Sequence, residues 1–113
     1  MKISDLHWIA GFIEGDGSFA MQGKNRSTVN VQINQVQRWP LEKLIELVGG
    51  YIGNTTQIGG FANSQPYYRW AISGYKGAGL MMTIYSLMSP KRKAQIKENL
   101  KIWRSRPARI KAT

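Results

Sequence analysis

Three kinds of residue are absent or scarce in this chain: cysteine, histidine and the acids. The 113 residues include no cysteine and a single histidine, His7. The chain can therefore form neither disulfides nor thiolate metal sites, and one imidazole cannot make a histidine cluster. Any bound metal must be held mainly by oxygen atoms, which suit Mg²⁺, Mn²⁺ or Ca²⁺.

Long apolar runs are also missing. The longest are far shorter than the roughly 18 residues that suggest a membrane-spanning helix, and the N-terminus lacks the pattern of a signal peptide. We therefore expect a soluble, intracellular protein with no membrane partner, in a compartment that the sequence leaves open. The length allows one domain with a modest core. We predict a single domain over residues 1–113, in which residues from about 104 to 113 form a basic C-terminal tail.

The shortage of acids leaves the chain strongly basic. Sixteen Lys and Arg stand against six Asp and Glu, which gives a formal net charge of +10 and a pI near 10.2. Such a balance indicates a polyanionic partner. A solvated basic surface or attraction to a membrane is the alternative, but no basic amphipathic helix with a broad apolar face dominates, so nucleic acid is favoured. Of the acids, only Glu14 and Asp16 are close neighbours in a glycine-rich setting.

Residues 9–17, Ile-Ala-Gly-Phe-Ile-Glu-Gly-Asp-Gly, predict an apolar helix that ends in an acidic turn. Gly11 and Gly15 are one turn apart, where a missing Cβ lets a second backbone approach closely. Asp16 precedes Gly17, which is placed to end the helix. A carboxylate at the negative end of a helix is unfavourable unless a cation is present, and a bound metal would supply one. Taken singly, these residues also fit a core helix with an ordinary stop. The residues on the core side have helical spacing: Leu6, Ile9, Ala10 and Ile13.

Together with Ser18 and Phe19, this stretch resembles the motif of the LAGLIDADG homing endonuclease family. All nine motif positions are matched, with mild replacements at four of them, Ile9, Phe12, Glu14 and Gly15. The resemblance implies a site-specific endonuclease of intron or intein homing, which hydrolyses both strands of a long double-stranded DNA site. It also implies a requirement for Mg²⁺, with Mn²⁺ or Ca²⁺ able to replace it in binding, and a homodimer, because this chain has one motif.

The resemblance also assigns roles to individual residues. It implies Asp16 as the metal ligand, assisted by the backbone carbonyl of Gly15, and it leaves Glu14 a local structural role. By the same likeness, Gln35 and Arg38 would order the solvent of the active site. Residues 90–95 resemble the family's basic segment, which suggests Lys91, with Lys93 close behind, as a catalytic lysine. A lysine that binds phosphate without a chemical role is the alternative.

The rest of the chain predicts an α+β fold of the order αββαββαα. Helices are expected from a cap at Ser4 or Asp5 to residue 16, from Trp39-Pro40 to Gly49-Gly50, after a lead-in at 74–79, and from Ser89-Pro90 onward. Strands are expected from residue 18, over 28–34, over 51–58 and over 67–73, with loops at 23–27 and 59–66. Two hairpins would make a four-stranded antiparallel saddle sheet with helices on one face, as in the αββαββα homing-endonuclease-like fold.

The open face of this sheet would be rich in amides and hydroxyls. Asn and Gln can pair with adenine in the major groove, and Lys or Arg with guanine, so we predict DNA contacts here. An amide-rich but merely solvated face is the alternative. We expect Tyr67, Arg69 and Ala71 to point outward and Tyr68, Trp70 and Ile72 to face the core. The predicted DNA-binding residues are Ser18, Gln22, Lys24, Arg26, Thr28, Asn30, Gln32, Asn34, Tyr51, Tyr67, Arg69 and Lys93.

One carboxylate per chain cannot build a two-metal site, but a two-fold dimer supplies two. We predict a dimer interface at Gly11 and Gly15, which would bring both Asp16 side chains toward the axis. Double-stranded DNA and a second copy of the chain are the expected partners, and no small-molecule substrate is expected. The alternative is a cleavage-deficient intron-RNA maturase or DNA-binding regulator of the same fold. A structural RNA-binding protein would explain the charge but not the glycine stripe and the acidic tip.

Overall fold

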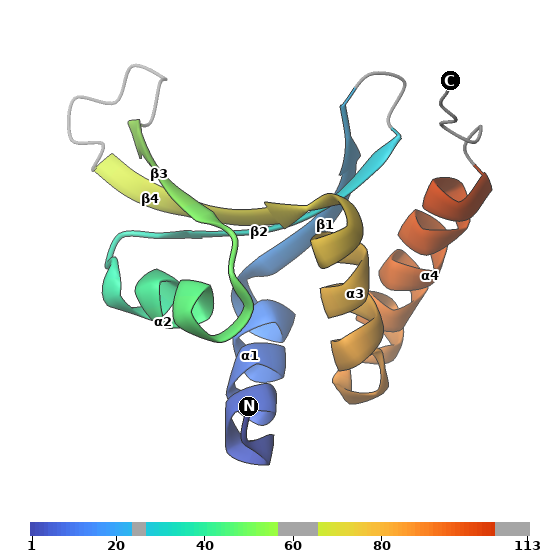
Figure 1. The fold of residues 1–113 in the computed structure, drawn as a ribbon, viewed down its shortest axis with the longest axis horizontal. Helices are drawn as coiled ribbons and strands as arrows, with labels where there is room; N and C mark the ends of the chain where they lie inside the picture. Colours follow the sequence, from blue (N-terminus) through green and yellow to red (C-terminus); the bar gives the residue numbers. More distant parts are fainter. Residues whose placement is uncertain (24–26, 57–65, 106–113) are drawn as a thin grey trace.

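The computed structural model describes residues 1–23, 27–56 and 66–105, without the side chains of 54–56. Its order of elements confirms the predicted α+β class (Figure 1). The elements are α1 (Ile3–Asp16), β1 (Gly17–Gln22), β2 (Thr28–Gln35), α2 (Trp39–Val48), β3 (Tyr51–Thr56), β4 (Pro66–Ser73), α3 (Gly74–Ile84), the 3₁₀ turn η2 (Tyr85–Leu87) and α4 (Pro90–Ser105). None of the helices within these residues has the length and apolarity needed to cross a membrane.

The four strands form one antiparallel sheet in the order β1-β2-β4-β3. The two hairpins are thus joined through β2 and β4, which leaves β1 and β3 at the edges. Figure 1 shows the sheet curving upward at both ends, with its concave face free of helices and the helices on the opposite side. The predicted saddle with helices on one face is confirmed.

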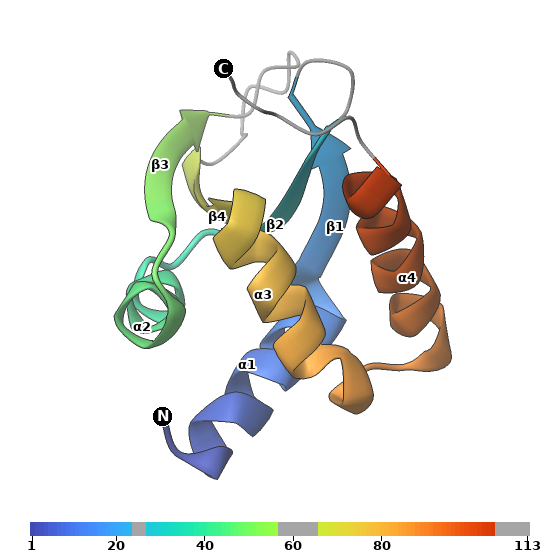
Figure 2. The ribbon, with the colours of Figure 1, turned by 45° about the vertical axis from the view of Figure 1, so that its right-hand side comes forward.

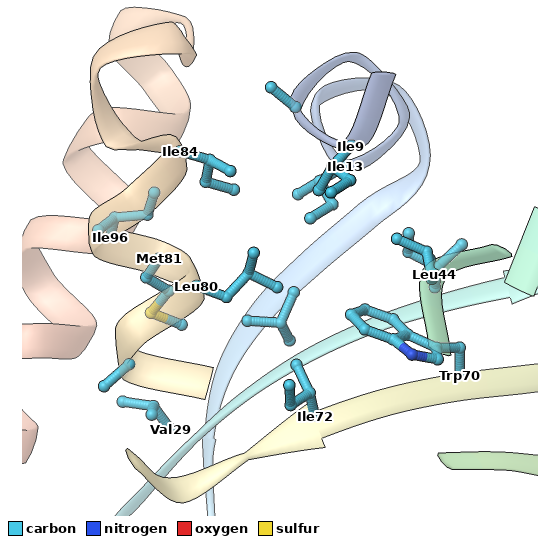
Figure 3. Close-up of a cluster of buried hydrophobic side chains, with 14 of the residues drawn as sticks. Ile9, Ile13, Val29, Leu44, Trp70, Ile72, Leu80, Met81, Ile84 and Ile96 are labelled. Atoms are coloured by element: carbon cyan, nitrogen blue, oxygen red, sulfur yellow. The ribbon is translucent and has the colours of Figure 1, made fainter. Parts of the chain in front are cut away.

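The core lies between the convex face of the sheet and the helices. Alternation along β2 turns Val29, Val31 and Ile33 toward the helices, and all three are fully buried, as predicted. Trp70 of β4 is the largest fully buried residue, and its indole Nε1 donates a hydrogen bond of 2.9 Å to the carbonyl of Gly49. Figure 3 shows side chains from α1, α2, α3 and α4 around this cluster, among them Ile9, Ile13, Leu44, Leu80, Met81, Ile84 and Ile96.

The first helix begins earlier than predicted. Neither Ser4 nor Asp5 is its N-cap, because the helix starts at Ile3 and Lys2 occupies the capping position. Asp5 instead lies in the first turn, where its Oδ2 accepts a hydrogen bond of 3.2 Å from the backbone N–H of Lys2. An acid in the first turn also suits the positive end of the helix dipole.

Residues 74–79 are helical and not a lead-in to the third helix, so the expected boundary was wrong. Gly77 is buried against the sheet, where an added Cβ would lie 2.9 Å from the carbonyl oxygen of Ile72. The small residues of this segment therefore let α3 approach β4 closely, which outweighs the low helix propensity of glycine. The helix ends at Ile84, so Leu87 falls in η2 and is exposed.

Ala71 was predicted to point outward but is only 2% exposed. It does lie on the open face, because it pairs with Gln32 on one side and with Tyr51 on the other. Directly opposed residues share a face, so these two larger side chains flank the small one. Tyr68, Trp70 and Ile72 lie on the other face and belong to the core or pack against it, as predicted.

Several predicted segments extend beyond the described residues. The end of the strand predicted over 51–58 and most of the loop predicted over 59–66 fall there, as do residues 24–26 of the basic turn. The predicted tail differs at its start, because α4 continues to Ser105 and Arg104 is helical. Residues 106–113 lie outside the described part.

Gly49 and Gly50 end α2, as predicted, with positive φ angles of 88° and 95°. Gly50 is exposed, but an added Cβ would lie 2.6 Å from Nε1 of Trp70 and 2.7 Å from the carbonyl oxygen of Ala71. We expect Gly50→Ala to lower the free energy of unfolding by about 3 kcal/mol through backbone strain and steric overlap. Urea denaturation followed by circular dichroism measures this change.

Gly79→Ala is the matched control. Gly79 lies inside α3 with no atom within 4 Å of an added Cβ. Alanine there should raise the free energy of unfolding by up to about 1 kcal/mol. Equal stability of the two variants would contradict the assigned role of Gly50.

Candidate functional site

Asp16 occupies the junction between the helical layer and the sheet. It is the last residue of α1, and β1 begins at the next residue. The backbone N–H of Gly17 donates to the carbonyl of Ile13, which closes the last helical turn as the chain passes into the strand. Asp16 itself is exposed. The sequence therefore places one accessible carboxylate at the tip of a helix whose other side is buried in the core.

Gln35 lies beside this carboxylate. Its Nε2 donates a hydrogen bond of 3.3 Å to Oδ2 of Asp16. The contact follows from the pairing of β1 with β2, because Gly17 is opposite Ile33 and Gln35 is the last residue of β2. The fold thus brings together two of the residues predicted for the site, although they are 19 positions apart in the sequence.

An open groove connects these two residues with the exposed side of α1. Its volume is about 470 Å³, and Trp39, which is 60% exposed, forms part of its wall. The ring of Trp8 lies in the same wall, with the Nζ of Lys43 at 4.3 Å from its centroid. The groove is lined by His7, Trp8, Gly11, Phe12, Asp16, Gln35, Trp39 and Pro40. It is largely aromatic, and its polar side chains are His7, Asp16 and Gln35.

Arg92 of α4 binds the C-terminus of α1. Its Nη2 donates to the carbonyl of Gly17 at 2.6 Å and to that of Glu14 at 3.2 Å, and its Nε lies 3.4 Å from the latter. The guanidinium also lies 5.5 Å from the ring centroid of Phe19. These carbonyls are at the negative end of the helix dipole, so a cation here is favourable. The sequence pointed to a bound metal as the cation at this helix tip, and within the described residues an arginine binds the carbonyls there.

Glu14 forms the reciprocal contact with α4. Its Oε1 accepts a hydrogen bond of 2.9 Å from the backbone N–H of Ser89, the residue before the helix. Hydrogen bonds from the backbone and the hydroxyl of Ser89 lower the pKa of Glu14, and the charge of Arg92 lowers it further, against an opposing effect of burial. Glu14 therefore joins two helix ends, in agreement with the structural role implied for it.

The other residues predicted for catalysis are less closely associated with Asp16. Arg38 forms an ion pair with Glu42 at 2.8 Å and lies 5.4 Å from the ring centroid of Tyr68. Lys91 is exposed in the first turn of α4, next to Arg92, so the joined helix ends place its backbone in the neighbourhood of the α1 tip. Lys93 has its Nζ 5.6 Å from the ring centroid of Tyr85, and it belongs to α4 and not to the sheet face.

Most residues predicted to bind DNA lie on the open sheet face. Ser18 opposes Gln32, and Gln22 opposes Thr28. Asn34 opposes Arg69, whose Nε donates to its Oδ1 at 3.2 Å. Tyr51 and Tyr67 complete the predicted set on β3 and β4, whereas Lys24 and Arg26 lie outside the described residues.

Asn30 differs from the prediction, because it is only 2% exposed. It lies on a central strand between Ala20 and Ser73, and its Nδ2 donates to Oε1 of Gln32 at 3.1 Å. A buried side chain with this bond is not presented to a base edge. Gln32, which accepts the bond, is half-buried.

The oxygen atoms at the helix tip fit a hard divalent cation only in part. Asp16 offers a carboxylate, and Gly15 in the last turn of α1 offers a backbone carbonyl. Within the described residues, no three His, Cys, Asp or Glu side chains are grouped so that they could hold a metal. One chain therefore supplies donors of the right chemistry but too few acidic ones, and a second chain would have to add its own.

Comparison with known protein families agrees with the geometry of the α1 tip. A sequence model described as LAGLIDADG endonuclease matches residues 9–98, most of the chain and all of the motif that ends at Gly17. The chain belongs to the LAGLIDADG endonuclease family. A comparison with curated proteins gives no match. In this LAGLIDADG chain, the motif helix is α1, and its acidic tip is the end held by Arg92.

Sequence reasoning missed Arg92 and Ser89 as parts of this LAGLIDADG site, and it missed the aromatic groove beside Asp16. The contribution of Arg92 was accessible in principle, because the helix dipole required a cation at the tip of α1 and the run 91–93 offered three. What the spacing did not reveal was which of the three faces inward. The groove depends on the packing of α1 against Trp39 and Pro40, which is a long-range contact.

The lowered pKa of Glu14 predicts a pH-dependent loss of stability. Because its pKa is lower in the folded chain, the carboxylate stabilises the fold above its ordinary pKa of about 4.5. This stabilisation is lost as the pH falls through the folded value. We expect Glu14→Gln to melt at a lower temperature than wild type near pH 7, and the difference to shrink below pH 4.5.

Thermal denaturation at several pH values checks this expectation. Glu98→Gln is the control, because Glu98 is an exposed acid on α4. Its melting temperature should follow that of wild type across the range. A gap for Glu14→Gln that stays constant with pH would show that the ionised carboxylate is not the stabilising species.

Proposed function

We propose that this protein is a site-specific endonuclease that cleaves both strands of a long duplex DNA site as a homodimer with Mg²⁺. The observation that carries the proposal is the exposed Asp16 at the tip of the family's motif helix, hydrogen-bonded to Gln35. Within the described residues, the hydrogen bond from Gln35 is the only one that Asp16 forms through its side chain. Glu14, by contrast, is engaged in joining two helices.

Mg²⁺ would be held by the carboxylate of Asp16 and the carbonyl of Gly15, with the same groups of a second protomer. When bound, it supplies a water of lowered pKa and neutralises charge on the leaving oxygen. The chain's own residues would do the rest. Asp16 orients the ion, Gln35 is held where it can position solvent through its amide, and Lys91 would offer positive charge to a scissile phosphate.

The dimer is proposed on the exposed side of α1. Gly11 and Gly15 are both exposed, and no atom lies within 4 Å of a Cβ built on either. A second α1 can therefore approach along this side, in an isologous contact that brings the two helix tips together. The neighbouring groove adds exposed apolar surface, which a partner would cover.

DNA is proposed for the concave face of the sheet. This face is free of helices in Figure 1, and it carries Ser18, Gln22, Thr28, Asn34 and Arg69. The net charge of +10 supplies attraction to phosphates, while the amides and hydroxyls suit base edges. Two such faces side by side would form a continuous surface for a long site.

The decisive variant is Asp16→Asn, which removes the negative charge and keeps the shape. We expect it to reduce the rate of Mg²⁺-dependent cleavage of the DNA that flanks the gene's own intron by about a thousandfold or more, while binding of that DNA in Ca²⁺ is retained. Plasmid linearisation measures cleavage, and a gel-shift assay measures binding. Chelation of Mg²⁺ should abolish cleavage by wild type.

Glu46→Gln provides the control for Asp16→Asn, because Glu46 is an exposed acid on α2. It should cleave like wild type. Tight DNA binding by wild type with no cleavage in either Mg²⁺ or Mn²⁺ would instead assign the chain to the family's cleavage-deficient members.

The dimer is tested by Gly11→Leu. A leucine at this position would separate the two helices, so we expect the dissociation constant of the dimer to rise at least tenfold, or the protein to become monomeric. Sedimentation equilibrium measures the mass, and circular dichroism confirms that the variant is folded.

Ala94→Leu adds the same side chain at an exposed position of α4 and should leave the dimer unchanged. A dimer of Gly11→Leu as tight as that of wild type would refute the proposed interface.

A further inference from the structure

Helix α4 carries a row of cations along its outer side. Lys93, Lys97, Lys101 and Arg104 are separated by four, four and three residues, so they share one face of the helix, within about 80° of arc. The last three are exposed. The adjoining side of α4 packs on the core through Ile96 and Leu100. We call these four residues the α4 basic stripe.

The α4 basic stripe lies away from the concave face of the sheet. Figures 1 and 2 both show α4 at the flank of the molecule, beside α3 and the edge strand β1, on the helical side of the sheet. A duplex bound in the saddle would occupy the other side of the sheet. The stripe is therefore a second basic surface, separate from the proposed DNA face.

No residue of the stripe forms an ion pair within the described part of the chain. Glu98 is the sole acid on α4, and the ion pair found within residues 1–23, 27–56 and 66–105 joins Arg38 to Glu42. Like charges four residues apart repel each other by about 0.2–0.5 kcal/mol per pair. Lys91 and Lys93 also oppose the positive end of the helix dipole. Repulsion between charges that brings the fold no stability is a feature of functional surfaces.

Arg92, in the same turn of α4 as Lys93, differs from the stripe because its charge is paired with hydrogen-bond acceptors. Its guanidinium is satisfied by the carbonyls of Glu14 and Gly17 and by Oε1 of Gln95. The stripe has no comparable contacts. Lys93 and Lys97 have their Nζ atoms 5.6 and 6.0 Å from the ring centroid of Tyr85, which supports the side chains but does not neutralise them.

We propose that the α4 basic stripe is a second DNA contact, which binds the phosphate backbone of duplex DNA without reading its sequence. From Lys93 to Arg104 the helix rises about 16 Å, which spans about five phosphates of one strand. Lysine offers a point charge and no base-specific pattern. The nearby ring of Tyr85 lies under two ammonium groups, so it is not a free platform for the stacking that single strands require.

Such a contact would capture noncognate DNA and keep the protein near a duplex while the sheet face is empty or in search of its site. Backbone contacts of this kind supply nonspecific affinity and allow transfer along DNA. The contact does not depend on cleavage, because Lys97 and Lys101, which the test below alters, do not line the groove beside Asp16.

The test compares two double variants that each remove two positive charges from the full chain. Lys97→Gln with Lys101→Gln alters the stripe, whereas Lys2→Gln with Lys76→Gln alters exposed lysines elsewhere. The probe is a noncognate duplex of thirty base pairs without Mg²⁺, and fluorescence anisotropy is measured over a series of KCl concentrations. Both variants have the same net charge, so a difference between them reports the location of the charges.

We expect the stripe variant to bind the duplex at least tenfold more weakly at 100 mM KCl. Its slope of log affinity against log salt should fall by about two, or by about four if both protomers of a dimer engage. The control variant should keep the wild-type slope. An equal loss in both variants would mean that only net charge matters, and no loss in the stripe variant would exclude the contact. Either result overturns the proposal.

A parallel titration with single-stranded RNA distinguishes the nucleic acid. If the stripe variant loses affinity for RNA while its duplex binding is unchanged, the assignment to duplex DNA is wrong. Folding is checked by melting temperature, which should equal or exceed that of wild type because the substitutions remove repulsion. If the variant melts lower, Lys101→Gln with Arg104→Gln tests the same stripe farther from the start of the helix.

Discussion

The junction between the end of α1 and the start of α4 is the contact on which the candidate site depends. A helix that ends in an acid concentrates negative charge there, from both the unpaired carbonyls and the carboxylates. Arg92 neutralises it by binding the carbonyls of Glu14 and Gly17, and Glu14 binds the backbone of Ser89 in return. The two helices are thereby fixed to each other and to β1. Asp16 can remain exposed because Glu14 and Arg92 form the contacts that hold the two helix ends together.

Local features explain why so much of the fold was predictable. The positions of Val29, Val31 and Ile33 follow from alternation alone, and the start of α2 follows from Pro40. The motif of residues 9–17 predicted the helix, its acidic tip and the family, and its stripe of buried residues was correct. Each of these depends on contacts between residues near in sequence, or on a burial pattern that repeats along one element.

The features that were missed depend on contacts between distant segments. Ala71 is covered because the register places Gln32 and Tyr51 beside it, and Asn30 is buried because it lies on a central strand bonded to Gln32. The choice of Arg92 from three successive cations is decided by how α4 is rotated against β1. Arg38 forms an ion pair with Glu42, one turn away, which its spacing from Asp16 did not indicate, and its role in the active site stays a prediction. The spacing of residues along the chain does not reveal which distant segments come into contact.

The joining of the hairpins through β2 and β4 also has a consequence for how the chain folds. Each hairpin closes a short loop, but the central pairing brings Asn30 to Ser73 and Gln35 to Tyr68, across a whole helix and hairpin. The entropy of closing that long segment must be lost before the curved sheet exists. The rate-limiting event of folding should therefore be the meeting of the two central strands, with α2 already formed between them. The same step would complete the core and form the concave surface proposed to bind DNA.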